Sequence, residues 1–345
     1  MTRIVVVMPN WFGETLFATP FVRALRSQLP NAFIAALGVE RACEVLQGNP
    51  CLNELVRFET SLMALPLIHR LRSRQFDTAI ILRRSLTRSL LLCLAGIPRQ
   101  IGFANPKSGW LLDVAVAAPT ATLHKARTYL SLLGSLDMSV DGPSLSYEYH
   151  PTAEEREQAS ALLRARGVTT QHPMIVVHPG ANWPHKRWSV DRFAQLAQRL
   201  GQDGTVVMTG GPEDRPLVQA IARQMTRPPV ILAGETSLRQ LAACLERADV
   251  VVSNDTGVLH IACALRRSVV ALYGPTSPAL TGPLGDPSRT IVIHHEGCCP
   301  TIPCLDPHHP GFPGMEAITV DEVADAVRLL LFQSLNHSIT QSPSS

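Results

Sequence analysis

Chemically reactive side chains gather in short loops that follow apolar runs of the chain. The first apolar run, residues 4–8, is followed by Gly13 and Glu14. Gly13 permits a tight turn, and Glu14 supplies a carboxylate that could act as a general base. A helix dipole also favours an acidic residue at the start of a helix, so a purely structural role for Glu14 stays open.

A second loop combines small residues with two cations. It reads HPGANWPHKRW from His178 onward, and its small residues let backbone amides approach a ligand. Lys186 and Arg187 could meet phosphate charge. A solvated basic loop is the alternative. Lys186 is one of only three lysines in the chain, which favours a specific role.

A third loop, TGGPED over residues 209–214, ends another strand pattern with two glycines. The missing side chains leave room for a ligand to approach the backbone. Glu213 or Asp214 could bind ribose hydroxyls, as acidic residues do in nucleotide-binding folds. Alternatively, both acids merely begin the following helix.

The strongest local signal is VSNDTGVLH, residues 252–260, where a buried strand passes directly into a helix. Free amides at that helix N-terminus, together with the dipole, make an anion site suited to a diphosphate. Asp255 and Thr256 are also good N-cap residues, so a structural role remains open for them. His260 faces the same end one turn later, although a single helical histidine is more often packed in a core.

Strands and helices alternate in both halves of the chain and must position these loops. Short Val- and Ile-rich runs predict strands of parallel sheets, buried on both faces. The predicted strands are 4–8, 33–37, 55–58, 78–82, 100–103, 174–178, 205–209, 229–232, 250–253, 269–273 and 290–294. The predicted helices are 19–29, 152–166, 190–201, 215–225, 238–247, 257–265 and 320–332. Two such doubly wound halves predict a ligand at the carboxyl ends of the strands.

The domain limits follow from a linker rich in Gly, Pro and Ser at residues 137–152. We expect a first domain over 1–150, a second over 151–332 and a disordered tail over 333–345. The last helix could pack back on the first domain. Thr152 and Glu155 have the spacing of a capping box that opens the helix after the linker.

Composition describes a globular chain of 345 residues with a formal net charge of +3, which argues against a nucleic-acid binder. The charge is unevenly spread: residues 1–136 carry 15 Lys and Arg against 7 Asp and Glu, whereas residues 137–345 carry 16 against 21. The basic half therefore points to an acidic partner, with chance clustering on a solvated face as the alternative. No signal-peptide core or membrane-spanning run is present, so we expect a cytoplasmic protein that at most touches a membrane surface.

Several kinds of chemistry lack their sequence signature. Neither GxGxxG nor a Walker A run occurs, and no Asp-x-Asp pair is placed to hold a metal with a diphosphate. We therefore expect metal-independent chemistry without a cofactor. A loop over 294–309 carries His294, His295, Cys298, Cys299, Cys304, His308 and His309. These are enough ligands for zinc, but their spacing matches no standard finger, and we favour an unliganded loop.

Taken together, PGA…KRW, LAGET, NDTGVLH and ALYGPTSP stand in the order of a known family, preceded by AGIPR…IG. The sequence resembles the ADP-heptose:lipopolysaccharide heptosyltransferases, particularly the heptosyltransferase II branch, to about residue 332. The resemblance implies an α/β fold of the GT-B type, two Rossmann-like domains facing across a cleft. It also implies inverting transfer of heptose from ADP-heptose to the inner core of lipopolysaccharide.

The resemblance also implies roles for individual residues. Lys186 matches the lysine that holds the donor phosphates and leaving group, and Glu213 matches the acid on the adenosine ribose. The loop and helix start that bind diphosphate and heptose correspond to Asp255, Thr256, Gly257 and His260, and the phosphate pocket is lined at Ala181 and Asn182. Glu14 takes the place of the general base, where the family usually has Asp; the extra methylene is a departure that can cost rate.

The acceptor side is assigned to the basic first domain. The acceptor would be the lipid A–Kdo inner core, whose anionic carboxylates suit Arg83, Arg84 and Arg88. The resemblance implies a position at the cytoplasmic face of the inner membrane with peripheral contact to it, and we expect a monomer. Two alternative hypotheses are an epimerase of nucleotide sugars with the same fold and a non-catalytic nucleotide-sugar-binding protein.

Overall fold

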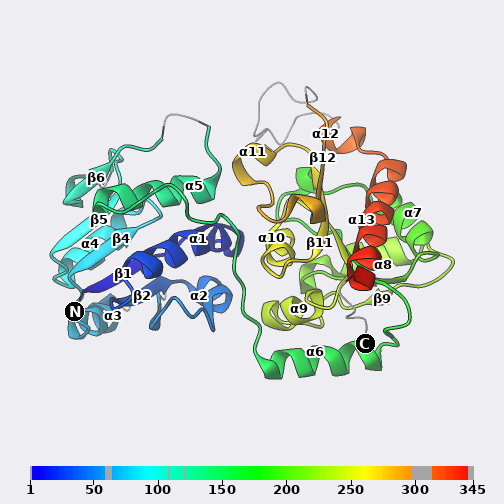
Figure 1. Cartoon of the computed structure of the whole chain (residues 1–345), viewed down its shortest axis with the longest axis horizontal. Helices are drawn as coiled ribbons and strands as arrows, with labels where there is room; N and C mark the ends of the chain where they lie inside the picture. The colour runs from blue at the N-terminus through cyan, green and yellow to red at the C-terminus, as the bar shows by residue number, and fades with distance from the viewer. Residues whose placement is uncertain (1, 59–63, 108, 120–121, 297–312, 341–345) are drawn as a thin grey trace. The chain divides into compact units, whose positions relative to one another are not determined.

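The computed structural model describes residues 2–58, 64–107, 109–119, 122–296 and 313–340. The chain divides into two compact units, Met1–His150 and Pro151–Ser345, each built around one six-stranded parallel sheet (Figure 1). Across these described ranges, no helix has both the length and the hydropathy needed to cross a membrane.

The sheet of the first unit has the order β3-β2-β1-β4-β5-β6. Its strands are β1 Arg3–Val7, β2 Phe33–Gly38, β3 Glu54–Arg57, β4 Thr78–Ile81, β5 Arg99–Phe103 and β6 Val114–Val116. Its helices are α1 Phe12–Gln28, α2 Glu40–Leu46, α3 Ala64–Ser73, α4 Leu86–Leu94 and α5 Lys125–Leu130, with 3₁₀ turns η1 Gly109–Leu111 and η2 Ser131–Leu136. Strand β6 was not predicted, because its three residues are too few to show a periodic pattern.

Strand β1 of the first unit is almost continuously apolar because it lies in the core. Val5 of β1 lies between Ala35 and Ala79 of the neighbouring strands, and all three side chains are buried. Strands covered on both faces tolerate continuous apolar runs, which is why β1 reads RIVVV. Helix α1 begins at Phe12, earlier than the predicted residue 19, so Glu14 lies in its first turn.

The sheet of the second unit has the order β12-β11-β10-β7-β8-β9. Its strands are β7 Met174–His178, β8 Thr205–Met208, β9 Val230–Ile231, β10 Val250–Asn254, β11 Ser268–Tyr273 and β12 Thr290–His294. Its helices are α6 Ala153–Ala165, α7 Val190–Leu200, α8 Arg215–Ala222, α9 Leu238–Leu245, α10 Gly257–Ala264, α11 Pro278–Thr281, α12 Pro313–Ala317 and α13 Val320–Thr340. The 3₁₀ turns are η3 Pro184–Lys186, η4 Pro212–Asp214 and η5 Pro287–Arg289.

The ends of the second unit show one agreement with the predictions and one difference from them. Thr152 and Glu155 form the predicted capping box of α6, with both hydrogen bonds present. Helix α13 continues to Thr340, so residues 333–340, expected to be a disordered tail, are helical. Val323, Val327 and Leu330 of the same helix lie in the core of the second unit. Packing of this helix on the first domain stays a prediction.

Both sheets have one point where the strand order reverses. In the first unit it lies between β1 and β4, and in the second between β7 and β10. Loops that leave the carboxyl ends of such a strand pair diverge and open space for a ligand. Glu14 and Arg83 follow β1 and β4, whereas Lys186 and Asp255 follow β7 and β10. The topology therefore brings the reactive loops together in pairs, one pair in each unit.

Candidate active site

The centre of the candidate site in the second unit is an ion pair between Lys186 and Asp255. Nζ of Lys186 lies 2.6 Å from Oδ2 of Asp255, and the lysine ammonium also lies 5.0 Å from the ring centre of Trp183. Lys186 ends the turn η3 after β7, and Asp255 follows β10 directly. The pair thus joins the two loops at the point where the strand order reverses.

Asp255 is buried and charged. Burial by itself raises the pKa of the Asp255 carboxyl, but His260 and Lys186 outweigh it and hold this pKa well below its usual range. Nε2 of His260 lies 3.9 Å from Oδ1, and Thr276 donates a 2.7 Å hydrogen bond to Oδ2. The carboxylate therefore stays ionised at physiological pH and fixes the lysine ammonium in place.

The loop before Lys186 is held by Asn254, the last residue of β10. The Asn254 side chain donates a 2.8 Å hydrogen bond to the carbonyl of Pro179 and accepts one of 3.3 Å from the backbone of Trp188. The Trp188 indole is buried and donates to the carbonyl of Ile318 at 3.1 Å. These contacts fix both ends of the segment that carries Lys186.

Helix α10 begins next to this ion pair. Thr256 is its N-cap in extended conformation, and Gly257 is its first residue. The Thr256 hydroxyl lies 3.1 Å from that of Ser253, and no side-chain cap occupies the first turn. The amides of the first turn are therefore available to an anion, and a lysine ammonium lies beside them. This arrangement suits a diphosphate.

The structure separates the two acids of the third loop. Asp214 is buried, accepts a 3.1 Å hydrogen bond from the Gly211 amide and lies 3.7 Å from Arg187. A Cβ on Gly180 would lie 2.3 Å from Oδ2 of Asp214, so this acid is packed directly against Gly180 in the loop that follows β7. Glu213 is exposed and remains the residue predicted to contact the ribose.

Ala181 and Asn182 lie at the turn that leaves β7. Ala181 is buried, and its carbonyl accepts a 2.9 Å hydrogen bond from Arg187, whereas Asn182 is exposed. Arg187 therefore fixes this turn through Ala181 and balances the charge of Asp214, and its guanidinium is less available to a ligand than Lys186. Contact of Ala181 and Asn182 with donor phosphates stays a prediction.

His178, at the end of β7, makes unfolding of the second unit depend on pH. Its Nδ1 lies 3.0 Å from the Thr209 hydroxyl, and burial lowers its pKa from 6.5 to about 4, against the opposing charge of Asp214. As pH falls, the unfolded chain therefore takes up the proton on His178 before the folded chain does. The contribution of neutral His178 to the free energy of unfolding is complete above pH 6.5 and is lost as pH drops toward 4, by roughly 3 kcal/mol at most. We expect His178→Asn to flatten this dependence, measured as urea unfolding midpoints of both proteins across that range; parallel curves would contradict it.

In the first unit, Glu14 lies in the first turn of α1 and pairs with α5. Its Oε1 is 3.6 Å from Nζ of Lys125, and the Glu14 side chain is 33% exposed, which leaves the carboxylate accessible to a substrate. Tyr129, one turn after Lys125, is buried; burial raises its pKa, and the charge of Glu14 adds to this effect. Lys125 was not singled out in the sequence, although the scarcity of lysines was a usable signal.

The three arginines assigned to the acceptor have different environments. Arg88 is buried and donates a 2.6 Å hydrogen bond to the carbonyl of Met8, and it also donates to the side chain of Asn10. Burial, with the charge of Arg83 as a smaller cause, lowers the pKa of Arg88 to about 10. The guanidinium of Arg88 therefore holds the loop before Glu14. Its contact with an acceptor stays a prediction.

Arg83 and Arg84 remain candidates for the acceptor. Arg84 is exposed, and Nη1 of Arg83 is buried with no hydrogen-bond acceptor among the residues that the structure describes. A buried guanidinium nitrogen without an acceptor is costly and suits an incoming oxygen ligand. The charge of Arg83 acts on the pKa of both Tyr129 and Arg88, and the charge of Glu14 also acts on the pKa of Tyr129.

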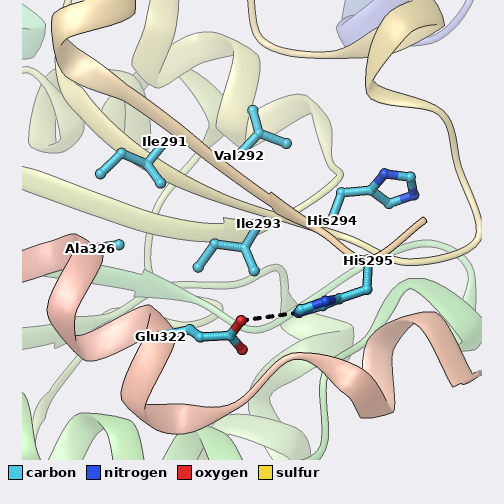
Figure 2. A pocket seen from close by; sticks show the side chains of 7 residues that line it. All are labelled: Ile291, Val292, Ile293, His294, His295, Glu322 and Ala326. Carbon is cyan, nitrogen blue, oxygen red and sulfur yellow. Dashed lines mark ion pairs between the residues drawn. The ribbon is translucent and has the colours of Figure 1, made fainter.

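A pocket between β12 and α13 contains the two described members of the Cys- and His-rich loop, His294 and His295 (Figure 2). Nε2 of His295 lies 3.2 Å from Oε1 of Glu322, while His294 points to the other side of the strand. Among the described residues, no group of three or more His, Cys, Asp and Glu side chains is placed to hold a metal ion. The other Cys and His residues of this loop lie outside the described residues: Cys298, Cys299, Cys304, His308 and His309. The prediction of an unliganded loop therefore stays a prediction.

Comparisons with known proteins find the same family that the sequence motifs resembled. The family model of glycosyltransferase family 9 (heptosyltransferase) matches residues 64–309. Lipopolysaccharide heptosyltransferase 2 of Escherichia coli strain K12 is 30% identical over 305 residues, which cover 84% of this chain and 87% of the relative.

Two solved structures share the fold over nearly the whole chain. A family 9 glycosyltransferase from Veillonella parvula DSM 2008 has a TM-score of 0.84 at 25% identity and covers 96% of this chain and 97% of its own. ADP-heptose lipopolysaccharide heptosyltransferase II of E. coli has a TM-score of 0.80 at 28% identity, with coverage of 96% and 99%. The predicted GT-B fold and the predicted enzyme class are confirmed. The chain belongs to glycosyltransferase family 9, the heptosyltransferases.

Proposed function

We propose that this protein transfers a heptose from ADP-heptose to the inner core of lipopolysaccharide with inversion at the anomeric carbon, as a heptosyltransferase II. The observation that carries the proposal is the Lys186–Asp255 pair beside the N-terminus of α10, at the reversal point of the second sheet. The similarity to E. coli lipopolysaccharide heptosyltransferase 2 supports the donor and acceptor classes. The acceptor is lipid A–Kdo inner core at the cytoplasmic face of the inner membrane.

The donor half of the reaction belongs to the second unit. The diphosphate binds at the first-turn amides of α10, with Thr256 and Gly257 at the helix start. Lys186 neutralises the charge that develops on ADP as the bond from the anomeric carbon to the phosphate oxygen breaks. Because Asp255 already fixes the ammonium, little reorganisation is needed during the reaction. His260 keeps Asp255 ionised, Glu213 binds the ribose, and the chemistry proceeds without a metal.

The acceptor half belongs to the first unit. Glu14 removes the proton from the attacking acceptor hydroxyl as that oxygen forms its bond to the anomeric carbon. Attack from the face opposite the departing ADP inverts the configuration, and ADP leaves with the electron pair. Lys125 holds the Glu14 carboxylate, and Arg88 holds the loop that precedes it.

Incubation with ADP-heptose, with and without a Kdo-bearing lipid acceptor, tests the function. We expect ADP release only when acceptor is present. Release without acceptor would indicate hydrolysis or an epimerase, and tight donor binding without turnover would indicate a non-catalytic binder. A panel of acceptors, from Kdo-lipid A to the singly heptosylated core, decides the position: preference for the singly heptosylated core supports heptosyltransferase II.

Arg83 and Arg84 are expected to bind the anionic acceptor. Replacing either arginine with Ala removes a charge-assisted hydrogen bond, so the acceptor KM should rise about tenfold while the donor KM stays unchanged. Initial rates at varied acceptor concentration measure the effect. Arg41→Ala, at an exposed arginine on α2, is the matched control. An unchanged acceptor KM in both variants would remove these residues from the acceptor site.

A further inference from the structure

Helix α4 of the first unit has its polarity reversed relative to a usual surface helix. Its one charged residue, Arg88, is 4% exposed, whereas Leu86, Leu90 and Leu94 are 45%, 46% and 52% exposed. These leucines are spaced i, i+4 and i+8, so they form one stripe about 12 Å long on the solvent side. Cys93 beside them is also exposed. A helix that exposes its leucines and buries its arginine indicates a surface that contacts a partner molecule or a membrane.

The surroundings of this stripe are aromatic and basic. Trp110, on the adjacent turn η1, is 74% exposed. Arg84 lies two residues before the helix, and Lys107 lies two residues before η1; both side chains are exposed. Arg72 of α3 donates a 2.7 Å hydrogen bond to the carbonyl of Leu94, which places its cation at the end of the stripe. Residues 78–112, which include α4 and Trp110, contain no Asp or Glu.

We propose that the α4 stripe, Leu86, Leu90 and Leu94 together with Trp110, is a docking surface for an anionic lipid bilayer. This inference rests on the proposed function, since a lipid-anchored acceptor requires the enzyme to work at a membrane surface. The leucines would enter the boundary between headgroups and acyl chains, the tryptophan would lie at headgroup level, and the surrounding cations would meet anionic headgroups.

Charge is what favours a bilayer over a protein partner. Each basic side chain near an anionic leaflet contributes on the order of 1 kcal/mol of attraction. Arg72, Arg84 and Lys107 flank the elements that carry the stripe, and residues 78–112 contain no acid. A second copy of this chain would bring an equally basic surface against the first one. Self-association through the stripe is therefore disfavoured by repulsion, whereas an anionic membrane neutralises these charges.

Co-sedimentation with vesicles tests the surface directly. We expect the full-length protein to bind vesicles of phosphatidylglycerol and phosphatidylethanolamine but not vesicles of phosphatidylcholine alone, and to lose binding as salt is raised. Replacing Leu90 and Leu94 together with Gln should lower the vesicle partition coefficient about tenfold or more, because two half-exposed leucines lose their burial in lipid. Leu94→Gln alone should give a smaller loss and keeps the test available if the double variant unfolds.

The matched control is Leu329→Gln with Phe332→Gln on α13. These side chains are 51% and 63% exposed, so the control removes similar apolar surface from the other unit. It should leave vesicle binding unchanged. The proposal is overturned if the wild type binds neither vesicle or both equally, or if the α4 variant binds like the wild type. It is also overturned if the wild type forms dimers that the α4 variant dissolves without any effect on vesicle binding.

The vesicle assay needs neither donor nor acceptor, so it fails or succeeds independently of the transferase assay. A second measurement links the two. With a water-soluble core oligosaccharide as acceptor, the Leu90 and Leu94 variant should keep the wild-type kcat/KM. With the same core presented on lipid in anionic vesicles, its kcat/KM should fall by a factor similar to the loss of vesicle binding. An equal loss with both acceptors would indicate damage to the catalytic unit instead.

Discussion

Glu14→Gln is expected to lower kcat by about 10³-fold while donor affinity stays near that of the wild type. The substitution keeps the size of the side chain and removes its ability to accept the proton of the acceptor hydroxyl. Donor affinity should persist because the residues that hold the diphosphate lie in the other unit of the chain. Single-turnover ADP release in the presence of acceptor measures the rate, and titration calorimetry with ADP measures the affinity.

Two further variants make this prediction specific. Glu14→Asp restores the family's residue but withdraws the carboxylate by one methylene, and a shift of about 1 Å can cost up to roughly 100-fold in rate. It should therefore fall between the wild type and Glu14→Gln. Arg26→Gln, on the last turn of the same helix, controls for general disturbance of α1. A Glu14→Gln enzyme that keeps more than a tenth of the wild-type kcat would exclude this carboxylate as the base.

The sequence predicted the second unit more closely than the first. Strands β7 and β12 have the predicted limits, because both are isolated by turn residues. Helix α1 was predicted to start at residue 19 but begins at Phe12. The reason is local: Trp11 is a poor N-cap with no side-chain hydrogen bond, so the usual start signal is missing.

In the candidate site, the sequence pattern identified individual residues, whereas the contacts between them depend on how the strands and loops pack. Spacing after a strand was enough to select Lys186 and Asp255, but their 2.6 Å pairing depends on which strands become neighbours in the sheet. Thr276, which donates to Asp255, comes from the loop after β11 and carries no signal of its own beyond its place in ALYGPTSP. Arg88 was assigned from its charge, whereas its burial against Met8 is visible only in the fold.

Lys186→Met is expected to lower kcat by about 10³-fold and to weaken donor binding as well. Two effects combine in this variant. The charge that develops on ADP loses its cation, and Asp255, with a side chain only 6% exposed, becomes a buried carboxylate without its ammonium partner beside an incoming diphosphate. Single-turnover ADP release and calorimetric titration with ADP separate the two losses, and Arg187→Met is the neighbouring control because Arg187 is engaged by Ala181 and Asp214.

A second substitution in the same pair decides whether Lys186 acts together with Asp255. Asp255→Asn alone should reduce kcat by about 10- to 100-fold, because the ammonium is no longer fixed at the start of α10. In the Lys186→Met background, however, Asp255→Asn removes an unpaired negative charge, so ADP affinity should rise above that of Lys186→Met alone. Strictly additive losses in the double variant would show that the two side chains act separately. Recovery of ADP affinity without recovery of kcat is the expected result, since the amides of α10 can still bind the diphosphate whereas expulsion of ADP needs the cation.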